Sequence, residues 1–381
     1  MRARRHRARG AAPARRRVRG CAPVWRATMP AVVVVVVVLL LLMMMMIALL
    51  ACRRRRSDDD VVVAIARTIS RSAPHADVAA WLTYHRRVGV RRFYVHVDDD
   101  GTTPSWTRAK DVRAFNHRNA RVDGSTLMEH PSLRPYAASP CGARALFVRQ
   151  TMFLERALVE ALADGADWLA HVDVDELMFP SAKNALDVRE VLRAIPRDVT
   201  RVVFPNHEAV PESWRNESSA VTFTSTTLFK RNHAHLDKNT YRKFSKLAAN
   251  GHSNYFLAYA NGKSAVRVNA RGVRPHGAHR FKSRAGREMT HDEAAILHFP
   301  FVDADRALRR VQRCDCPSDA IANCSMLGFD IELRRHADLG ASAFDAFFRA
   351  RVEARPALTR ALLKAGVFVR EYSPTLVLLK K

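Results

Sequence analysis

The first thirty residues contain no acidic residue and no serine, although they include ten arginines. An organellar transit peptide is typically rich in serine as well as arginine, so this N-terminus does not fit one. The chain also lacks an internal repeat and a nucleic-acid-binding motif, and few aromatic residues interrupt its basic segments. We therefore expect neither a repeat architecture nor a nucleic-acid partner.

Residues 32–51 form twenty unbroken apolar positions. At about 1.5 Å per residue, a helix of this length spans about 30 Å and matches the hydrocarbon core of a bilayer. Ten arginines precede this run, and the four that follow it give way to acids at residues 58–60. Because positive residues favour the cytoplasmic side, we expect a basic cytoplasmic tail (residues 1–31), a signal-anchor (32–51) and a short lumenal stem (52–60).

A cleaved signal peptide is the alternative to an anchor. The apolar run is longer than the usual hydrophobic region of a signal peptide, and residues 48–52 make a poor cleavage site. The same topology accounts for part of the net charge of +26, since residues 1–60 contribute +11 and leave +15 for the remaining 321 residues. That remainder favours a polyanionic partner or a nucleotide diphosphate.

Four of the six cysteines lie beyond residue 60, in the expected lumenal domain, and an even number suits one or two disulfides in an oxidising compartment. They are Cys141, Cys314, Cys316 and Cys324. A zinc site is the alternative, although this spacing is not typical of one. Glycosylation sequons at residues 216–218 and 323–325 also favour the lumen of the secretory pathway.

Strands and helices alternate in the first half of the lumenal part. Apolar and β-branched runs predict strands over residues 61–66, 93–97, 121–123 and 168–174, and helical spacing predicts helices over 78–88 and 144–163. This order predicts an α/β fold with a mostly parallel, doubly wound sheet in a domain over residues 61–340. Less regular strands are expected at 199–204, 221–230 and 263–268, and residues 341–381 form a C-terminal segment with a helical tail.

Three acids end the last strand of this first half. The run from Trp168 to Val172 is apolar, and Asp173, Asp175 and Glu176 follow it within four residues. Alternation places the two aspartates on one side, where they repel each other unless a cation lies between them. Oxygen ligands at a strand end suit Mg²⁺ or Mn²⁺. The alternative is that these acids cap the next turn and pair with arginines.

Two segments of the chain resemble glycosyltransferase family 92 and related family-2-like enzymes. The segments are Ala80–Val90 with Phe93–Val95, and Asp167–Leu177, which agree in order and spacing. The resemblance covers about residues 61–310. It implies a nucleotide-diphospho-sugar transferase fold and a single-pass type II enzyme of the Golgi or another secretory-pathway membrane. Residues 68–72 depart from the family pattern, so the early nucleotide contacts are not carried over.

The resemblance also implies a reaction. Asp173 and Asp175 would hold Mn²⁺, or Mg²⁺, against the diphosphate of a UDP-sugar, and a hexose, with galactose favoured, would pass to a glycan or glycoprotein acceptor. Glu176 would fix neighbouring backbone or an arginine. Related folds supply a third metal ligand from the C-terminal part, and His298 is the best placed residue for that role. The group is inverting, so a carboxylate should deprotonate the acceptor hydroxyl.

Other candidates follow from position along the chain. We expect the base to be Glu208, or alternatively Asp292 or Glu293, although acids in such places are more often caps or surface groups. Contacts with the donor are expected from a further set of residues that follow predicted strands or lie in the basic, histidine-rich region. These are Asp98 for the nucleoside, and Arg67, Lys263, His276 and His279 for the phosphates.

Two other functions remain open on the sequence. A metal-dependent phosphoester hydrolase would need a nucleophilic aspartate followed by a Gly-Thr turn, whereas Glu176-Leu177-Met178 follows here. A non-catalytic, lectin-like module would show no Mn²⁺-dependent binding of UDP. The Gly262-Lys263-Ser264 tripeptide lacks the earlier glycine of a P-loop.

Overall fold

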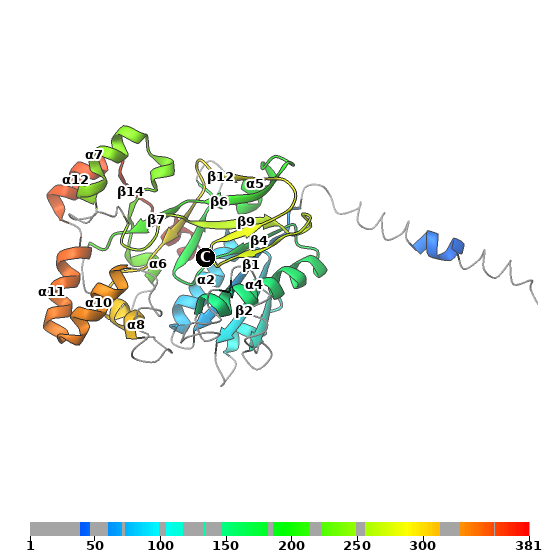
Figure 1. Ribbon diagram of the computed structural model, residues 1–381, viewed down its shortest axis with the longest axis horizontal. Coiled ribbons are helices and arrows are strands. Elements are labelled where there is room, and N and C mark those ends of the chain that lie inside the picture. Colours follow the sequence, from blue (N-terminus) through cyan, green and yellow to red (C-terminus); the bar gives the residue numbers. More distant parts are fainter. Residues whose placement is uncertain are drawn as a thin grey trace, which may run out of the picture. The chain divides into compact units, whose positions relative to one another are not determined.

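A computed structural model of the protein (Figure 1) describes residues 39–45, 60–70, 73–98, 104–116, 133–134, 146–181, 186–212, 222–248, 256–312, 328–353 and 355–380. The chain divides into two units, Met1–Asp59 and Asp60–Lys381, which we consider separately. In the first unit, residues 39–45 are helical.

The rest of the predicted anchor, over residues 32–38 and 46–51, lies outside the described residues. Among the ranges given above, no helix combines the length and apolar character needed to cross a membrane. The four cysteines and both sequons also fall outside these ranges, so the disulfides and the glycosylation sites stay predictions.

A seven-stranded sheet forms the centre of the second unit. Its strands are β1 (Val63–Ser70), β2 (Arg92–Asp98), β3 (Val112–Asn116), β4 (Trp168–His171), β6 (Val199–Phe204), β9 (Lys263–Arg267) and β12 (Arg287–Thr290), in the order β12-β6-β9-β4-β1-β2-β3. Strands β4, β1, β2 and β3 are parallel, and the parallel arrangement of β4, β1 and β2 was predicted. Because β9 runs antiparallel to both β4 and β6, the sheet is mixed rather than mostly parallel.

Helices cover both faces of this sheet. They are α2 (His75–Arg87) and α4 (Leu146–Ala163). Alternate residues of β1 point to opposite faces, so Val63 and Ile65 pack in one core cluster with Trp81 of α2, whereas Ala64 and Ala66 pack in another with residues of α4. Both helices were predicted from their apolar spacing, and Gly89 follows α2 with a φ of 100°.

A second, five-stranded sheet was not predicted. Its strands are β5 (Glu176–Phe179), β7 (Asn206–Ala209), β8 (Leu228–Lys230), β13 (Ala295–His298) and β14 (Phe368–Arg370), in the order β14-β8-β7-β13-β5. The strand predicted over 221–230 is wrong in part, because α6 (Thr222–Ser225) precedes β8. The strand predicted at 121–123 lies outside the described residues, and β3 was missed.

The remaining elements are short or lie towards the C-terminus. They are η1 (Ser105–Arg108), α5 (Val188–Arg193), η6 (His233–His235), α7 (Lys238–Ala248), β10 (Arg274–His276), β11 (Arg280–Lys282), α8 (Ala304–Gln312), α10 (Gly328–Asp338), α11 (Ala341–Val352), α12 (Pro356–Lys364) and α13 (Ser373–Leu379). The C-terminal segment is mostly helical, as predicted, but it also contributes β14 to the second sheet.

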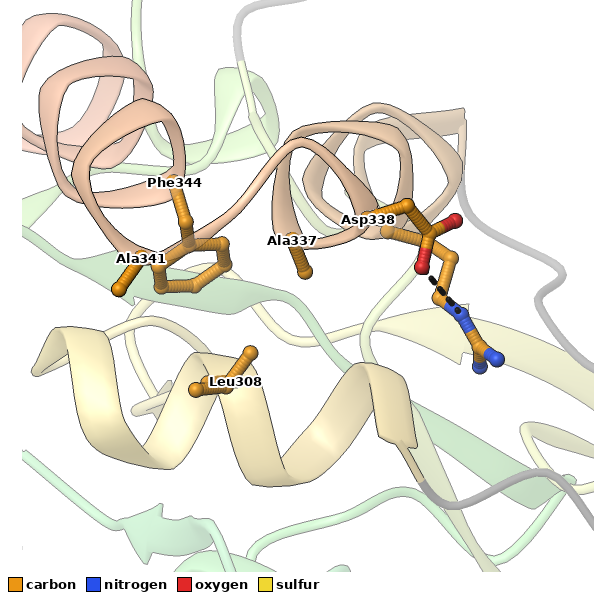
Figure 2. Close-up of a pocket in the computed structure, with 6 residues that line it drawn as sticks. Leu308, Ala337, Asp338, Ala341 and Phe344 are labelled. Atoms are coloured by element: carbon orange, nitrogen blue, oxygen red, sulfur yellow. Dashed lines mark ion pairs between the residues drawn. The ribbon is translucent and has the colours of Figure 1, made fainter.

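Helices α8, α10 and α11 surround a small cavity. Figure 2 shows side chains from all three helices converging on it, and its volume is about 310 Å³. Leu308, Ala337, Ala341 and Phe344 supply apolar walls, and Arg334 Nε lies 3.8 Å from Asp338 Oδ1 beside them. None of the predicted site residues lines this cavity.

Gly262 should tolerate no side chain. Its φ is +62°, and a Cβ there would lie 2.1 Å from the carbonyl oxygen of Phe204. We expect Gly262→Ala to lower the free energy of unfolding by about 2 kcal/mol or more, from the left-handed backbone and the clash with the main chain. Gly328→Ala is the control, because a Cβ at that position, which begins α10, would meet nothing within 4 Å. Urea denaturation of both variants tests this, and equal stability of the two would contradict it.

Candidate functional site

The acidic turn lies between the two sheets, because β4 ends at His171 and β5 begins at Glu176. Within the turn, the Glu176 backbone NH donates to the Asp173 carbonyl at 2.9 Å, and the Asp173 NH donates to Glu176 Oε2 at 2.7 Å. Glu176 therefore stabilises the turn by bonding to the Asp173 backbone, and fixing neighbouring backbone is one of the roles expected for it. β4 lies between β1 and β9 in the sheet, and the carboxyl ends of the parallel strands β1, β2, β3 and β4 share one edge.

Two cations hold the carboxylate of Asp173. Arg67 of β1 pairs with its Oδ1, and Lys263 at the start of β9 donates to its Oδ2 at 2.9 Å. The Lys263 side chain is 1% exposed, and its Nζ also lies 3.6 Å from Glu176 Oε2. Burial alone would raise the pKa of Asp173, but these two cations outweigh it and hold that pKa well below its usual range.

Asp175 faces a different pair of side chains. His298 Nε2, at the end of β13, lies 3.7 Å from Asp175 Oδ2, and Arg310 Nη1 of α8 lies 3.6 Å from the same oxygen. Arg310 is oriented by Asp330 of α10, at 3.0 Å. Burial raises the pKa of Asp175, but the interaction with His298 and the charge of Arg310 lower it to about 2. Asp175 is thus an anion near neutral pH.

Tyr259 connects these groups, and no sequence pattern pointed to it. Its hydroxyl donates to Glu176 Oε1, and its ring contacts His279 and His298 with centroid distances of 4.5 Å and 4.6 Å. Arg310 was missed as well, because an arginine in a basic amphipathic helix is usually solvated. Only the folded chain brings either residue to the acidic turn.

Two histidines beside the turn are neutral, of which His171 is buried and His279 is half-buried. His279 Nδ1 donates to the Gly262 carbonyl at 3.1 Å, and His171 Nδ1 donates to the Ala278 carbonyl at 2.7 Å. Burial, with a smaller contribution from the Lys263 ammonium, lowers the pKa of each to about 3. His171 Nε2 points towards Asp173 Oδ1 at 3.9 Å and has no hydrogen-bond partner among the described residues.

Helix α2 fixes the strand that follows the turn. Trp81 Nε1 donates to the Glu176 carbonyl at 3.0 Å, and the Tyr84 hydroxyl donates to the Met178 carbonyl at 3.0 Å. His85 accepts from the Met178 NH at 3.2 Å through Nε2, while its Nδ1 donates to the Trp81 carbonyl at 2.8 Å. The two sequence segments that carried the family resemblance are therefore in direct contact.

The acids expected as the base lie in contrasting surroundings. Glu208 of β7 is 1% exposed, and it accepts from Lys230 Nζ at 2.7 Å and from the backbone NH groups of Leu257 and Ala258 at 3.0 Å and 2.7 Å. These contacts occupy both oxygens and favour a structural ion pair over a base. The Asp292 side chain is 92% exposed and precedes β13, whose opposite end carries His298.

The predicted donor contacts divide in two groups. Arg67, Lys263 and His279 lie around the acidic turn, although Arg67 and Lys263 are already engaged by Asp173. His276 is exposed in β10. Asp98 ends β2, where its backbone pairs with Ser70 at the carboxyl edge of the sheet, and its side chain lies outside the described part.

The donor set fits a divalent cation in part. Asp175 and His298 offer an oxygen and a nitrogen close together, a combination that suits Mn²⁺ and leaves positions for water and phosphate oxygens. Asp173 faces the same edge, but two cations hold it. Within the described ranges, no group of three or more His, Cys, Asp or Glu side chains is arranged to hold a metal ion. The residues present thus supply two protein donors.

The fold and this site define an α/β protein with a cluster of charged side chains at the end of its central strands. Two curated proteins of Arabidopsis thaliana, both described as glycosyltransferase-like, are similar to it over most of its length. One is 32% identical over 336 residues, which cover 82% of this chain and 71% of the relative. The other is 30% identical over 331 residues, which cover 82% of this chain and 63% of the relative. The chain belongs to this glycosyltransferase-like family.

No protein-family model matches the chain, and family 92 in particular is not confirmed. Among solved structures, a galactosyltransferase in complex with donor and acceptor sugar analogs is 11% identical and aligns over 54% of this chain and 58% of its own, with a TM-score of 0.21. A TM-score this low supports no conclusion about fold or function.

Acid should weaken the contact between His85 and Met178. Burial lowers the pKa of His85 to about 3, so the unfolded chain binds a proton near pH 6.5 that the folded chain excludes. The stability from His85 is present above pH 6.5 and is lost as the pH falls towards 3, by up to about 1.4 kcal/mol per pH unit. Denaturant midpoints measured from pH 7 to 5 should fall less steeply in His85→Gln than in the unaltered protein. Parallel curves would contradict the assignment.

Glu208→Gln should lower the free energy of unfolding of the protein rather than remove a catalytic base. The change leaves the Lys230 ammonium buried without its counter-charge, which should cost about 3 kcal/mol. Replacing both residues, as Glu208→Gln with Lys230→Met, should recover much of that loss, because it removes the buried ammonium and keeps a side-chain oxygen for the backbone NH groups of Leu257 and Ala258. Urea denaturation measures both variants. A fully stable Glu208→Gln variant that loses activity would instead restore Glu208 as the base.

Proposed function

We propose that the protein is a metal-dependent glycosyltransferase that moves a hexose from a nucleotide sugar to a glycan or glycoprotein acceptor. The observation that carries this proposal is the arrangement of the acidic turn, where Asp175 lies within 4 Å of both His298 and Arg310 at the carboxyl edge of the central sheet. Membership of a glycosyltransferase-like family supports transfer of a sugar. The nucleotide sugar, the metal and the hexose are inferences from the site and from the resemblance to family 92.

The charges of the site suit a diphosphate. Asp173, Asp175 and Glu176 are matched in number by Arg67, Lys263 and Arg310, and Asp330 also pairs with Arg310, so these side chains have no excess of positive charge by themselves. A divalent cation held by Asp175 and His298 would add an excess of positive charge, which would neutralise the negative charge that develops on a departing diphosphate. The positive charge added by the cation would attract the two negative charges of a UDP-sugar. Binding of the cation would therefore strengthen binding of the donor, and binding of the donor would strengthen binding of the cation.

The protein groups have distinct tasks in this proposal. Lys263 and Arg67 keep Asp173 ionised and fixed, Tyr259 and α2 hold the turn, and Arg310 reaches the diphosphate from α8. An inverting reaction also needs a base near the acceptor hydroxyl. Glu208 is held by Lys230 and Asp292 is exposed, so neither is assigned as the base. We retain the predicted anchor over residues 32–51 and a Golgi or other secretory-pathway location as parts of the proposal.

Removal of the Asp175 charge should abolish turnover. The full-length chain is assayed for hydrolysis or transfer of a panel of UDP-sugars with Mn²⁺, with Mg²⁺ and with EDTA. Asp175→Asn should lower kcat/KM at least about a hundredfold, since it removes a charged donor that acts in the transition state. Asp198→Asn is the matched control, because that aspartate only pairs with Arg287 on the surface. It should retain full activity.

Two results would overturn the proposal. Full activity in EDTA would exclude a role for the divalent cation, and activity in Asp175→Asn equal to the control would remove the turn from the reaction. Phosphate release from a simple phosphoester, without a nucleotide sugar, would favour the hydrolase alternative.

A further inference from the structure

Helices α7 and α12 lie side by side at the end of the second unit where β14 and β8 pair (Figure 1). Their apolar residues face one another and the strands beneath them. Tyr241 and Phe244 of α7 belong to the same core cluster as Leu358, Leu362 and Leu363 of α12. The outer faces of both helices are consequently left to polar side chains.

These outer faces carry positive charge only. The exposed basic residues are Lys238, Arg242 and Lys243 on α7, and Arg355, Arg360 and Lys364 at the start and on the length of α12. Neither helix contains an acidic residue. Asp237, which precedes α7, is turned to the backbone NH groups of Asn239 and Thr240 at 3.0 Å and 2.9 Å. Within the described part of the chain, no ion pair neutralises any of the six.

The basic character is local and does not simply follow from the net charge of the protein. On α10 and α11, three of the four arginines lie beside acids, among them Arg349 with Glu353 at 2.9 Å and Arg351 with Glu332 at 2.9 Å. Arg334 likewise approaches Asp338 at 3.8 Å. Helices of similar length in the same unit are therefore charge-balanced, whereas α7 and α12 are not.

A groove of about 500 Å³ runs between α7 and α12. Lys243 of α7 and Lys364 of α12 line it together with the polar side chains of Asn239 and Thr240, and Phe244 supplies apolar surface. Two unneutralised ammonium groups on one groove repel each other, and an anion between them removes that repulsion. The polar side chains beside them can bond to hydroxyl groups, which favours a sugar chain that carries the anion.

We propose that the α7–α12 groove binds an anionic segment of the glycan acceptor, one whose sugar units carry carboxylate or sulfate groups. This inference rests on the proposed transferase function for the identity of the partner as an acceptor. A membrane surface is the other anionic partner to consider. Helices that lie on membranes expose large apolar side chains, and no such exposed side chain is found on α7 or α12 among those described.

Direct binding tests the groove. Isothermal titration calorimetry of the full-length chain is carried out with a polygalacturonate oligosaccharide, a heparin oligosaccharide and a neutral maltooligosaccharide. We expect binding of at least one anionic probe, weakened by salt, and none of the neutral one. The variant Lys243→Glu with Lys364→Glu should lower the affinity at least tenfold. The control Arg335→Glu with Arg349→Glu makes the same change in net charge on α10 and α11 and should change it less than twofold.

Three outcomes would overturn the inference: no anionic probe binds, both double variants weaken binding equally, or the groove variant reduces retention on phosphatidylserine vesicles while leaving oligosaccharide binding intact. Unfolding midpoints confirm that both variants are folded. Hydrolysis of the UDP-sugar without acceptor separates this inference from the proposed function. If the groove variant loses oligosaccharide binding but hydrolyses the UDP-sugar unchanged, the groove is supported as an acceptor site. If the groove binds anionic oligosaccharides but the unaltered protein turns over no UDP-sugar, the anion-binding surface stands and the proposed transferase function is wrong.

Discussion

The contact on which the site depends is the buried ammonium of Lys263, which lies between the carboxylates of Asp173 and Glu176. Without that cation, the buried carboxylate of Glu176 would face the half-buried carboxylate of Asp173 within one short turn, and Glu176 would take up a proton or leave the interior. Lys263 begins β9, the antiparallel strand inserted beside β4. The departure from a parallel sheet is thus what delivers the charge that the acidic turn requires.

A second set of contacts gives the turn its shape. Three side chains of α2 bond to the backbone of β5: Trp81, Tyr84 and His85. Tyr259, which precedes β9 in the chain, bonds to the Glu176 carboxylate. Aromatic residues suit this task because they bring large buried rings and one directional polar group each. The turn is therefore held through main-chain atoms on one side and through a carboxylate on the other, which leaves the Asp175 side chain available to ligands.

Sequence patterns predicted the parts of the fold whose signals are local. Strands β1, β2 and β4 lie in continuous apolar or β-branched runs, helices α2 and α4 have apolar residues at helical spacing, and the acidic turn follows β4 directly. Strands of three or four residues such as β8 and β14 are too short to show a period. Tyr259 and Arg310 reach the site through distant packing, and Glu208 finds its partner Lys230 only across a strand pair. No local pattern reports such encounters.

The pairing of β13 with β5 has a mechanical consequence. His298 is in register with Glu176 across this antiparallel pair, and with Glu208 on the other side of β13. The His298 imidazole and the acidic turn are therefore carried by two hydrogen-bonded strands, β13 and β5. Neither can move relative to the other without breaking this strand pairing. Arg310 of α8, which belongs to neither sheet, lies 3.6 Å from Asp175, and Arg306 of the same helix pairs with Asp77 of α2. Helix α8 therefore connects the acidic turn to the helix that also fixes β5.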